Sequence, residues 1–321
     1  MTPASTALAP TASNFSGLEQ LDLTVAAPVA TAHLRFGATS SAAYDTQHGC
    51  WCIQPGGSIQ VVLNLPNLQG VTFILQPNLN AVSTVPTYSG TIHVNNDTFS
   101  VEFDPHSDPR SLVQSWYLSA TMLTAGDNVI TLTLNGSVPL YIQAAYVMVF
   151  QMQEQLKSEW CWAAVTSSLS SFLTPQNAMS QCQVVNQVRK QQGGATATVD
   201  CCQSGVTAPA CNQPNSLSTA LTTNGWLQCY HPFHLPPDVI RNLINRGKPL
   251  PILIYWREGN GFYGGGHYVV ITGVGPDDPT DLGATLIAVE DPLNGPSVLP
   301  YSVLINQYKG TGCWLYSYVL E

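Results

Sequence analysis

The first half of the chain carries short apolar runs separated by turn residues. The runs cover 58–65, 71–75, 91–94, 99–103, 115–120, 128–134 and 140–150. Turn-forming residues occupy the gaps, as at 54–57, 95–97, 125–128 and 135–136. The segment 131–134 alternates polar and apolar residues, which is typical of a half-buried strand. Several short strands at this spacing predict an antiparallel β-sandwich over 18–150.

After residue 150 the pattern changes to helices followed by strands. Helical periodicity over 161–173 places residues 161, 165, 169 and 172 on one face, and Thr174-Pro175 ends the segment. Two shorter helices are predicted at 216–223 and at 236–247. Strands are predicted at 250–256, 268–274, 285–290 and near 313–319. Helices first and strands afterwards predict an α+β domain over 151–321.

The two predicted domains follow a short polar arm. Residues 1–17 are rich in Thr, Ala, Ser and Pro and are predicted to be flexible. They show neither the basic start nor the apolar core of a secretion signal. The stretch from Leu123 to Val149 resembles the last strands of jelly-roll carbohydrate-binding modules. The resemblance implies a jelly-roll-like sandwich with a carbohydrate as candidate partner.

The composition of the chain argues against nucleic-acid binding and against a transmembrane segment. Only 9% of the residues are charged, and the ten Lys and Arg form no basic run, which excludes a nucleic-acid footprint. No apolar stretch reaches the length of a transmembrane segment. Nine cysteines with so few charges favour an oxidising compartment, so we expect a secreted or extracellular protein. Because nine is odd, we expect four disulfides and one free thiol. No CxxC pair occurs, and we expect neither a metal nor a cofactor.

Cys161 stands where the first predicted helix begins. The thiolate is the attacking form of a cysteine nucleophile, and the positive end of the helix dipole favours a negative charge there. Trp160 and Trp162 flank the thiol and would shield a cleft. Gln155 lies six residues upstream, from where its amide can donate to an oxyanion beside the Cys161 backbone N–H.

A cysteine nucleophile needs a partner base, and histidine is the usual one. The chain has seven: His33, His48, His93, His106, His231, His234 and His267. Four lie in the β domain, and His231 and His234 lie in a loop bracketed by prolines. Only His267 opens an apolar strand, directly after three glycines that let backbone approach a substrate closely. His267 is therefore the predicted base.

The base in turn needs an acceptor that orients its far nitrogen. Asp291 ends the next predicted strand and precedes Pro292. If that strand pairs with the strand of His267, the two side chains lie close together. Asn294 and Glu290 are alternative orienters, although strand alternation points Glu290 to the face opposite Asp291.

Three segments of the second half resemble papain-like cysteine proteases, most closely the bacterial branch that includes effector proteases of plant pathogens. The segment Gln155-Leu-Lys-Ser-Glu-Trp-Cys161-Trp-Ala-Ala resembles the family's active-site segment. Gly266-His267-Tyr-Val-Val-Ile-Thr-Gly and Val289-Glu-Asp291-Pro292 resemble its His and Asp segments. The resemblance covers about 151–321 and follows the family order of Gln, Cys, His and Asp.

The resemblance implies a helical lobe that carries the Cys, a β-rich lobe that carries the His, and a cleft between them. The resemblance also implies the role of each residue: Cys161 is the nucleophile, His267 the general acid and base, Asp291 the residue that orients His267, and Gln155 the oxyanion donor. The implied activity is that of a cysteine endopeptidase with a protein or peptide substrate. The sequence departs from plant and lysosomal papains, because Ser158-Glu159-Trp160 replaces their Cys-Gly-Ser and the orienter is Asp rather than Asn.

Several alternatives remain open at this level. The same triad could serve a peptidoglycan hydrolase or another amidase, and the chain could be a lectin-like or adhesive protein with an inactive protease scaffold. The β domain could target, bind or inhibit. Asp291 could merely begin a turn, and Cys161 could be an inert buried thiol. In the β domain, Trp51, Trp116 and Tyr117 either stack on sugar or pack in the core, and we expect Cys50 and Cys52 each to bridge to another strand.

Overall fold

The computed structural model describes residues 33–45, 50–65, 70–77, 88–103, 114–194, 198–203, 209–258, 263–275 and 281–321. The chain divides into two compact units, Met1–Val149 and Phe150–Glu321. The predicted arm at 1–17 lies outside the described residues. None of the described helices is long and apolar enough to cross a membrane.

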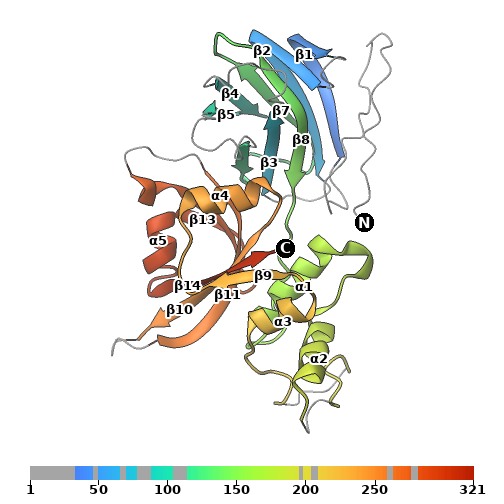
Figure 1. Cartoon of the computed structure of the whole chain (residues 1–321), viewed down its shortest axis with the longest axis vertical. Helices are drawn as coiled ribbons and strands as arrows, with labels where there is room; N and C mark the ends of the chain where they lie inside the picture. The colour runs from blue at the N-terminus through green and yellow to red at the C-terminus, as the bar shows by residue number, and fades with distance from the viewer. Residues whose placement is uncertain are drawn as a thin grey trace. The chain divides into compact units, whose positions relative to one another are not determined.

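The described residues of the first unit form strands and turns without a helix, as expected (Figure 1). Its described residues form eight strands: β1 His33–Asp45, β2 Cys50–Leu65, β3 Val71–Pro77, β4 Tyr88–Val94, β5 Asp97–Phe103, β6 Gln114–Leu118, β7 Gly126–Leu134 and β8 Leu140–Met148. The strand order is β5-β4-β7-β2-β8-β3-β6, with β1 beside β2, and every pairing is antiparallel. Alternate residues of seven of these strands meet in one hydrophobic core, so the predicted β-sandwich is confirmed.

The long strand β2 changes partner halfway along its length. Residues 51–53 pair with β8, and residues 58–65 pair with β7. Gly56 has a φ of 75°, and a Cβ added at Gly57 would lie 2.6 Å from the Ser40 carbonyl oxygen. The turn predicted at 54–57 is therefore wrong, because the glycines bend one continuous strand instead of ending it.

The burial of Trp51, Trp116 and Tyr117 tests whether these side chains can stack on a sugar. Trp51 and Trp116 are 8% and 6% exposed and belong to the core cluster, while Tyr117 is only partly buried. A buried indole cannot stack on a sugar, so the sugar-stacking alternative is wrong for these two tryptophans.

In the part of the second unit that the structure describes, five α-helices combine with one antiparallel sheet. Its elements are α1 Cys161–Leu173, η2 Pro175–Asn177, α2 Gln181–Gln192, α3 Leu217–Thr223, β9 Leu227–His231, α4 Pro237–Asn245, β10 Leu250–Arg257, β11 Tyr263–Val274, η3 Leu282–Ala284, β12 Leu286–Glu290, β13 Ser297–Pro300, α5 Tyr301–Asn306 and β14 Gly312–Leu320. The sheet order is β13-β12-β11-β10-β14-β9. Helices α1, α2 and α3 pack on one another, and α1 also contacts β11. The α+β class is confirmed.

Helix α1 is buried almost all round rather than on one face. Only residues 171 and 173 are not buried. Its buried hydroxyls are satisfied locally, since Thr166 donates to the Trp162 carbonyl at 2.7 Å and Ser168 donates to the Ala164 carbonyl at 2.7 Å. Hydroxyls paired in this way let a serine-rich helix lie in the interior.

Helix α2 was not predicted, although its start carries a readable signal. Ser180 and Gln183 form a capping box, in which the Gln183 side chain accepts from the Ser180 backbone N–H at 2.8 Å. Val184, Val185 and Val188 then form its buried face.

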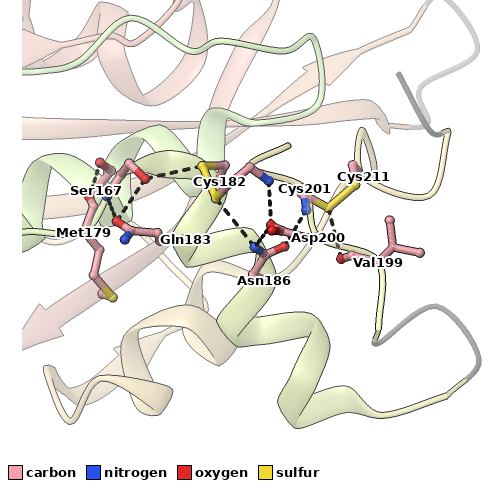
Figure 2. The surroundings of a disulfide bond; sticks show 11 residues. Ser167, Met179, Cys182, Gln183, Asn186, Val199, Asp200, Cys201 and Cys211 are labelled. Atoms are coloured by element: carbon pink, nitrogen blue, oxygen red, sulfur yellow. Dashed lines mark hydrogen bonds between the residues drawn. A yellow bond between two sulfur atoms is a disulfide. The ribbon is translucent and has the colours of Figure 1, made fainter. Parts of the chain in front are cut away.

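Two disulfides form instead of the four expected, and both lie in the helical part of the second unit. They join Cys182 to Cys202 and Cys201 to Cys211. Figure 2 shows the Cys201–Cys211 bond and its surroundings. The adjacent cysteines are held by Asn186 and Asp200, whose side chains accept from the Cys201 and Cys202 backbone N–H groups.

The other cysteines are unbridged: Cys50, Cys52, Cys161, Cys229 and Cys313. The register gives the reason for the two in β2, because Cys50 lies opposite Asp45, and Cys52 lies opposite Ala43 and Tyr141. With no cysteine across the strand, the bridges expected for Cys50 and Cys52 cannot form.

Candidate active site

Cys161 is the first residue of α1 and is 8% exposed. The flanking indoles are pinned to one loop, since Trp160 Nε1 donates to the Cys211 carbonyl at 2.7 Å and Trp162 Nε1 donates to the Gln213 carbonyl at 3.1 Å. The Cys201–Cys211 disulfide ties this loop down. The thiol therefore sits at a helix N-terminus whose surroundings are held in place.

His267 comes from the sheet rather than from the helices. It lies within β11, opposite Ile254 of β10, whereas the sequence predicted it at the start of the strand. Its Nε2 donates to Asp291 Oδ1 at 2.8 Å. Cys161 is the other group that acts on the imidazole, because its interaction with His267 helps to raise the pKa of His267, and both side chains line one cleft.

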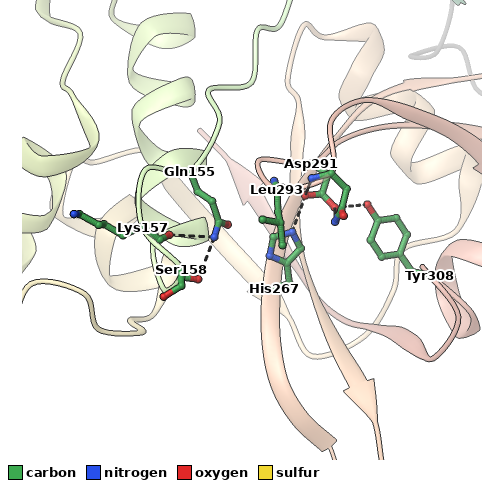
Figure 3. A network of polar contacts seen from close by, with 8 residues as sticks. Gln155, Lys157, Ser158, His267, Asp291, Leu293 and Tyr308 are labelled. Atoms are coloured by element: carbon green, nitrogen blue, oxygen red, sulfur yellow. Dashed lines mark hydrogen bonds and ion pairs between the residues drawn. The ribbon is translucent and has the colours of Figure 1, made fainter. Parts of the chain in front are cut away.

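Asp291 follows directly on β12, and β12 pairs with β11 as the sequence argument required. The carboxylate is 2% exposed and receives several donors. Oδ1 accepts from His267 and from the backbone N–H groups of Leu293 at 2.7 Å and Asn294 at 3.0 Å. Oδ2 accepts from Asn294 Nδ2 at 2.8 Å and from the Tyr308 hydroxyl at 2.7 Å (Figure 3). A carboxylate bonded in this way has one fixed orientation.

Asp291 also begins a turn, so the two interpretations of this residue are compatible. The Asp291 carbonyl accepts from the Gly295 N–H at 2.9 Å, and Gly295 has a φ of 74°. The alternative orienters occupy other places. Asn294 holds Asp291, and Glu290 is buried without a hydrogen bond to His267 among the described contacts.

The electrostatics of the pair follow from burial and hydrogen bonding. Burial alone would lower the pKa of His267, but the hydrogen bonds to Asp291 and Cys161 and the charge of Asp291 outweigh it and raise the pKa to about 9. Burial alone would raise the pKa of Asp291, but the bonds from His267, Asn294 and Tyr308 hold it well below its usual range. The arrangement favours an imidazolium beside a carboxylate.

Gln155 lies beside this pair, with its side-chain amide folded back on its own segment (Figure 3). Nε2 donates to the carbonyls of Lys157 and Ser158, both at 3.1 Å. Oε1 is buried and has no hydrogen-bond partner among the described residues. The Gln155 backbone N–H donates to the Pro292 carbonyl at 2.8 Å, which joins this segment to the turn of Asp291.

The four residues named from the sequence meet around one cleft. Gln155, Cys161 and His267 line a hollow of about 340 Å³ together with Trp162, Tyr255 and Tyr268, and Asp291 lies directly behind His267. Within the described ranges, no group of three or more His, Cys, Asp or Glu side chains is placed to hold a metal ion.

Sequence reasoning missed two aromatic residues of the site. Tyr308 donates to Asp291, and the Trp256 ring lies nearly parallel to the rings of His267 and Tyr308. No local motif marks either residue, because both reach the site through the packing of β10 and of the loop before β14. The support from Asn294 did have a signal, since Asp followed three residues later by Asn in a Pro-containing turn is typical of side-chain to backbone bonding.

Comparisons with known proteins give one family and several solved structures. Residues 142–309 match the family model described as papain-like cysteine protease AvrRpt2. The search of curated proteins finds no match.

The similar solved structures cover about a third of the chain. One is Xyl-CBM35 in complex with a glucuronic acid containing disaccharide, with 14% identity and a TM-score of 0.29 over 36% of this chain and 86% of that chain. A family 35 carbohydrate binding module from an environmental isolate has 20% identity and a TM-score of 0.29, over 36% of this chain and 86% of that chain. The family 35 module from Clostridium thermocellum has 18% identity and a TM-score of 0.30, over 37% of this chain and 98% of that chain.

The family match covers more than half of the chain and includes the Cys, His and Asp segments quoted from the sequence. It confirms the resemblance inferred from those segments and the expectation of a thiol-dependent hydrolase. The chain belongs to the papain-like cysteine proteases of the AvrRpt2 family.

Proposed function

We propose that this cysteine peptidase cleaves peptide bonds with Cys161 as nucleophile, His267 as acid and base, Asp291 as orienter and Gln155 as oxyanion donor. One observation carries the proposal. The His267 imidazole bonds to a buried carboxylate, and it lines one cleft together with a thiol that stands at a helix N-terminus. These are the parts that nucleophilic acyl transfer requires.

The reaction begins with the Cys161 proton on His267. The thiolate attacks the peptide carbonyl carbon, and the carbonyl oxygen becomes an oxyanion held by the Cys161 backbone N–H and Gln155. His267 then gives its proton to the leaving amine nitrogen as the C–N bond breaks, which leaves a thioester on Cys161. Water attacks the thioester, His267 takes the water proton, and the acid product leaves with the thiolate restored.

Gln155 has to move slightly to play this part. Its Nε2 hydrogens point to the carbonyls of Lys157 and Ser158 in the free enzyme. We infer that one of these bonds is exchanged for the oxyanion when the tetrahedral intermediate forms, because a charge-assisted bond is stronger than a neutral one. Catalytic hydrogen bonds commonly tighten only in the reacting complex.

Single variants of the full chain test the proposal. Cys161→Ala and His267→Ala should abolish cleavage of a peptide library, while Gln155→Ala should lower kcat by about 10²–10³, the usual loss of one oxyanion donor. Labelling of Cys161 by an epoxide that traps papain-type thiolates should disappear in His267→Ala. Undiminished cleavage by Cys161→Ala would refute the proposed nucleophile.

The substrate class needs its own comparison. The peptide library and purified peptidoglycan should be offered to the same preparation, with Cys161→Ala as the blank. Cleavage of peptides without release of peptidoglycan fragments supports an endopeptidase. The opposite result identifies the amidase alternative, and labelling without turnover of either substrate leaves an inactive scaffold.

We also propose that the protein works in an oxidising, extracellular setting. The two disulfides support this, because such bridges do not persist in a reducing cytosol. The β unit contributes none of the four proposed site residues, which fits a role in targeting, binding or inhibition. A glycan array probed with the full-length Cys161→Ala protein tests carbohydrate binding by the β unit. An array without signal would exclude carbohydrate binding and leave targeting by other means or inhibition.

A further inference from the structure

We propose that Tyr308 is a positioning residue of this active site, whose hydroxyl fixes the Asp291 carboxylate in the orientation that pairs it with His267. The proposal rests on the proposed roles of Asp291 and His267. Tyr308 does not line the cleft and touches neither Cys161 nor His267 through its hydroxyl. It would act on the reaction only through Asp291.

The chain holds Tyr308 in place by a tight loop between α5 and β14. The Tyr308 N–H donates to the Gly312 carbonyl at 3.0 Å, and the Gly312 N–H donates to the Tyr308 carbonyl at 2.9 Å. Lys309 and Gly310 between them have φ values of 47° and 104°. The Tyr308 side chain is 1% exposed. A side chain anchored in this way loses little further entropy when it bonds to Asp291.

Trp256 packs beside Tyr308 and links it physically to the imidazole. Its ring lies 6.3 Å from the Tyr308 ring at 18° and 6.5 Å from the His267 ring at 19°. The fit is close, because a Cβ added at Gly312 would lie 2.5 Å from Trp256 Cζ3 and 2.6 Å from the Tyr308 carbonyl oxygen. The aromatic ring of Tyr308 thus has a packing role that is separate from the role of its hydroxyl.

The hydroxyl bonds to the carboxylate oxygen that faces away from the imidazole. Tyr308 and Asn294 both donate to Oδ2, while His267 donates to Oδ1. Donors on both oxygens prevent rotation of the carboxylate about its Cβ–Cγ bond. Burial and the charge of Asp291 hold the pKa of Tyr308 well above its usual range, so the hydroxyl stays a donor at every working pH.

The titratable neighbours of the pair are few. The groups that act on His267 are Asp291 and Cys161, and those that act on Asp291 are His267 and Tyr308, together with the Asn294 amide. Glu159, Tyr255 and Tyr268 also line the cleft, and the buried Glu290 precedes Asp291 in the chain. A neutral donor such as Tyr308 draws negative charge from the carboxylate, so its loss leaves more of that charge facing the imidazolium.

The test is a pH profile of kcat/KM for Tyr308→Phe, which keeps the ring packed on Trp256 and removes only the hydroxyl. We expect kcat/KM to fall about tenfold, as for the loss of a hydrogen bond to a charged group. We also expect the alkaline limb of the profile to move to higher pH, because the imidazolium is better stabilised. An alkaline limb that coincides with that of the wild type would overturn the proposal.

Tyr301→Phe is the matched control. Tyr301 is also buried, and its hydroxyl donates to the Leu235 carbonyl at 3.1 Å and bonds to His234 at 2.8 Å, with no bond to Asp291. Its loss should lower the melting temperature without moving the pH profile. Equal shifts in both variants would show a structural effect and would also overturn the proposal.

A double-mutant cycle separates an action through Asp291 from a general one. In the Asp291→Ala background, Tyr308→Phe should change neither kcat/KM nor the pH profile further. A full additional loss there contradicts the proposal. If Tyr308→Phe does not fold by circular dichroism, Asn294→Ala replaces it, because it removes the other side-chain donor to Oδ2 and should move the alkaline limb in the same direction.

Failure of this inference and failure of the proposed function look different. If Cys161→Ala and His267→Ala keep wild-type activity, the proposed function fails whatever Tyr308 does. If both are inactive and Tyr308→Phe matches the wild type in kcat/KM and in pH profile, only the positioning role of Tyr308 fails.

Discussion

Glu290 offers a quantitative test of the electrostatics of the sheet. Its side chain is 9% exposed, and no hydrogen bond or opposite charge reaches it from the described residues. Burial raises its pKa from 4.5 to about 7. At about 1.4 kcal/mol per pH unit, the difference between these values corresponds to roughly 3 kcal/mol. That is the largest stabilisation we expect from Glu290→Gln, which keeps the shape of the neutral side chain.

The sign follows from linkage between protonation and folding. The folded state keeps the Glu290 proton between pH 4.5 and about 7, whereas the unfolded state loses it. The unfolded state therefore binds fewer protons in this window, and the free energy of unfolding falls as pH rises through it. Above about pH 7 both states are ionised and the penalty is constant. Glu290→Gln should therefore be close to the wild type at pH 4 and more stable at pH 8.

The assay is urea unfolding followed by tryptophan fluorescence at pH 4, 6 and 8, in the Cys161→Ala background to prevent self-cleavage. The difference between variant and parent is the quantity of interest, since other titrating groups cancel in it. With Cys161 intact, Glu290→Gln should also keep peptidase activity, because Glu290 makes no hydrogen bond to His267 among the described contacts. A stability difference that is the same at all three pH values would refute the reasoning.

Three further outcomes are expected. Asp291→Ala should leave measurable activity and move the alkaline limb of kcat/KM to lower pH, because the imidazolium of His267 loses its carboxylate; an unmoved limb places the orienter elsewhere. Alkylation of the denatured, unreduced chain should add five labels by mass, and a single label would instead support the four disulfides expected from the sequence. In the native protein the exposed Cys229 should be modified before the buried Cys50, Cys52 and Cys313. Gly312→Ala should lower the free energy of unfolding by about 1–3 kcal/mol, because the added Cβ clashes with Trp256. The control Gly265→Ala should not lower it, since no atom lies within 4 Å of the Cβ added there. Equal melting temperatures of the two variants would contradict the packing argument.

The sequence by itself predicted most of the helices and strands and the order of the candidate site residues along the chain. Periodicity predicted α1 to its last residue, because side chains repeat every 3.6 residues and a proline ends the run. Short apolar runs between turn residues predicted seven strands of the sandwich, although they missed β1 and placed the start of β2 too late. The family resemblance named Cys161, His267, Asp291 and Gln155, and strand order then required β11 and β12 to pair for the His and Asp to meet. These are features that neighbouring residues encode.

The tertiary structure alone decided how distant segments meet. Cysteine count and spacing do not give connectivity, and the pairing of Cys182 with Cys202 depends on how α2 packs against its loop. The glycines of β2 led to the prediction of a turn at 54–57. In the structure the same residues bend one strand at the point where its pairing partner changes from β8 to β7. Tyr308 reaches Asp291 from 17 residues away through the loop before β14. No local pattern records such a contact, since it is set by the packing of whole strands, and the hydrogen bond forms only after that packing has brought the two side chains together.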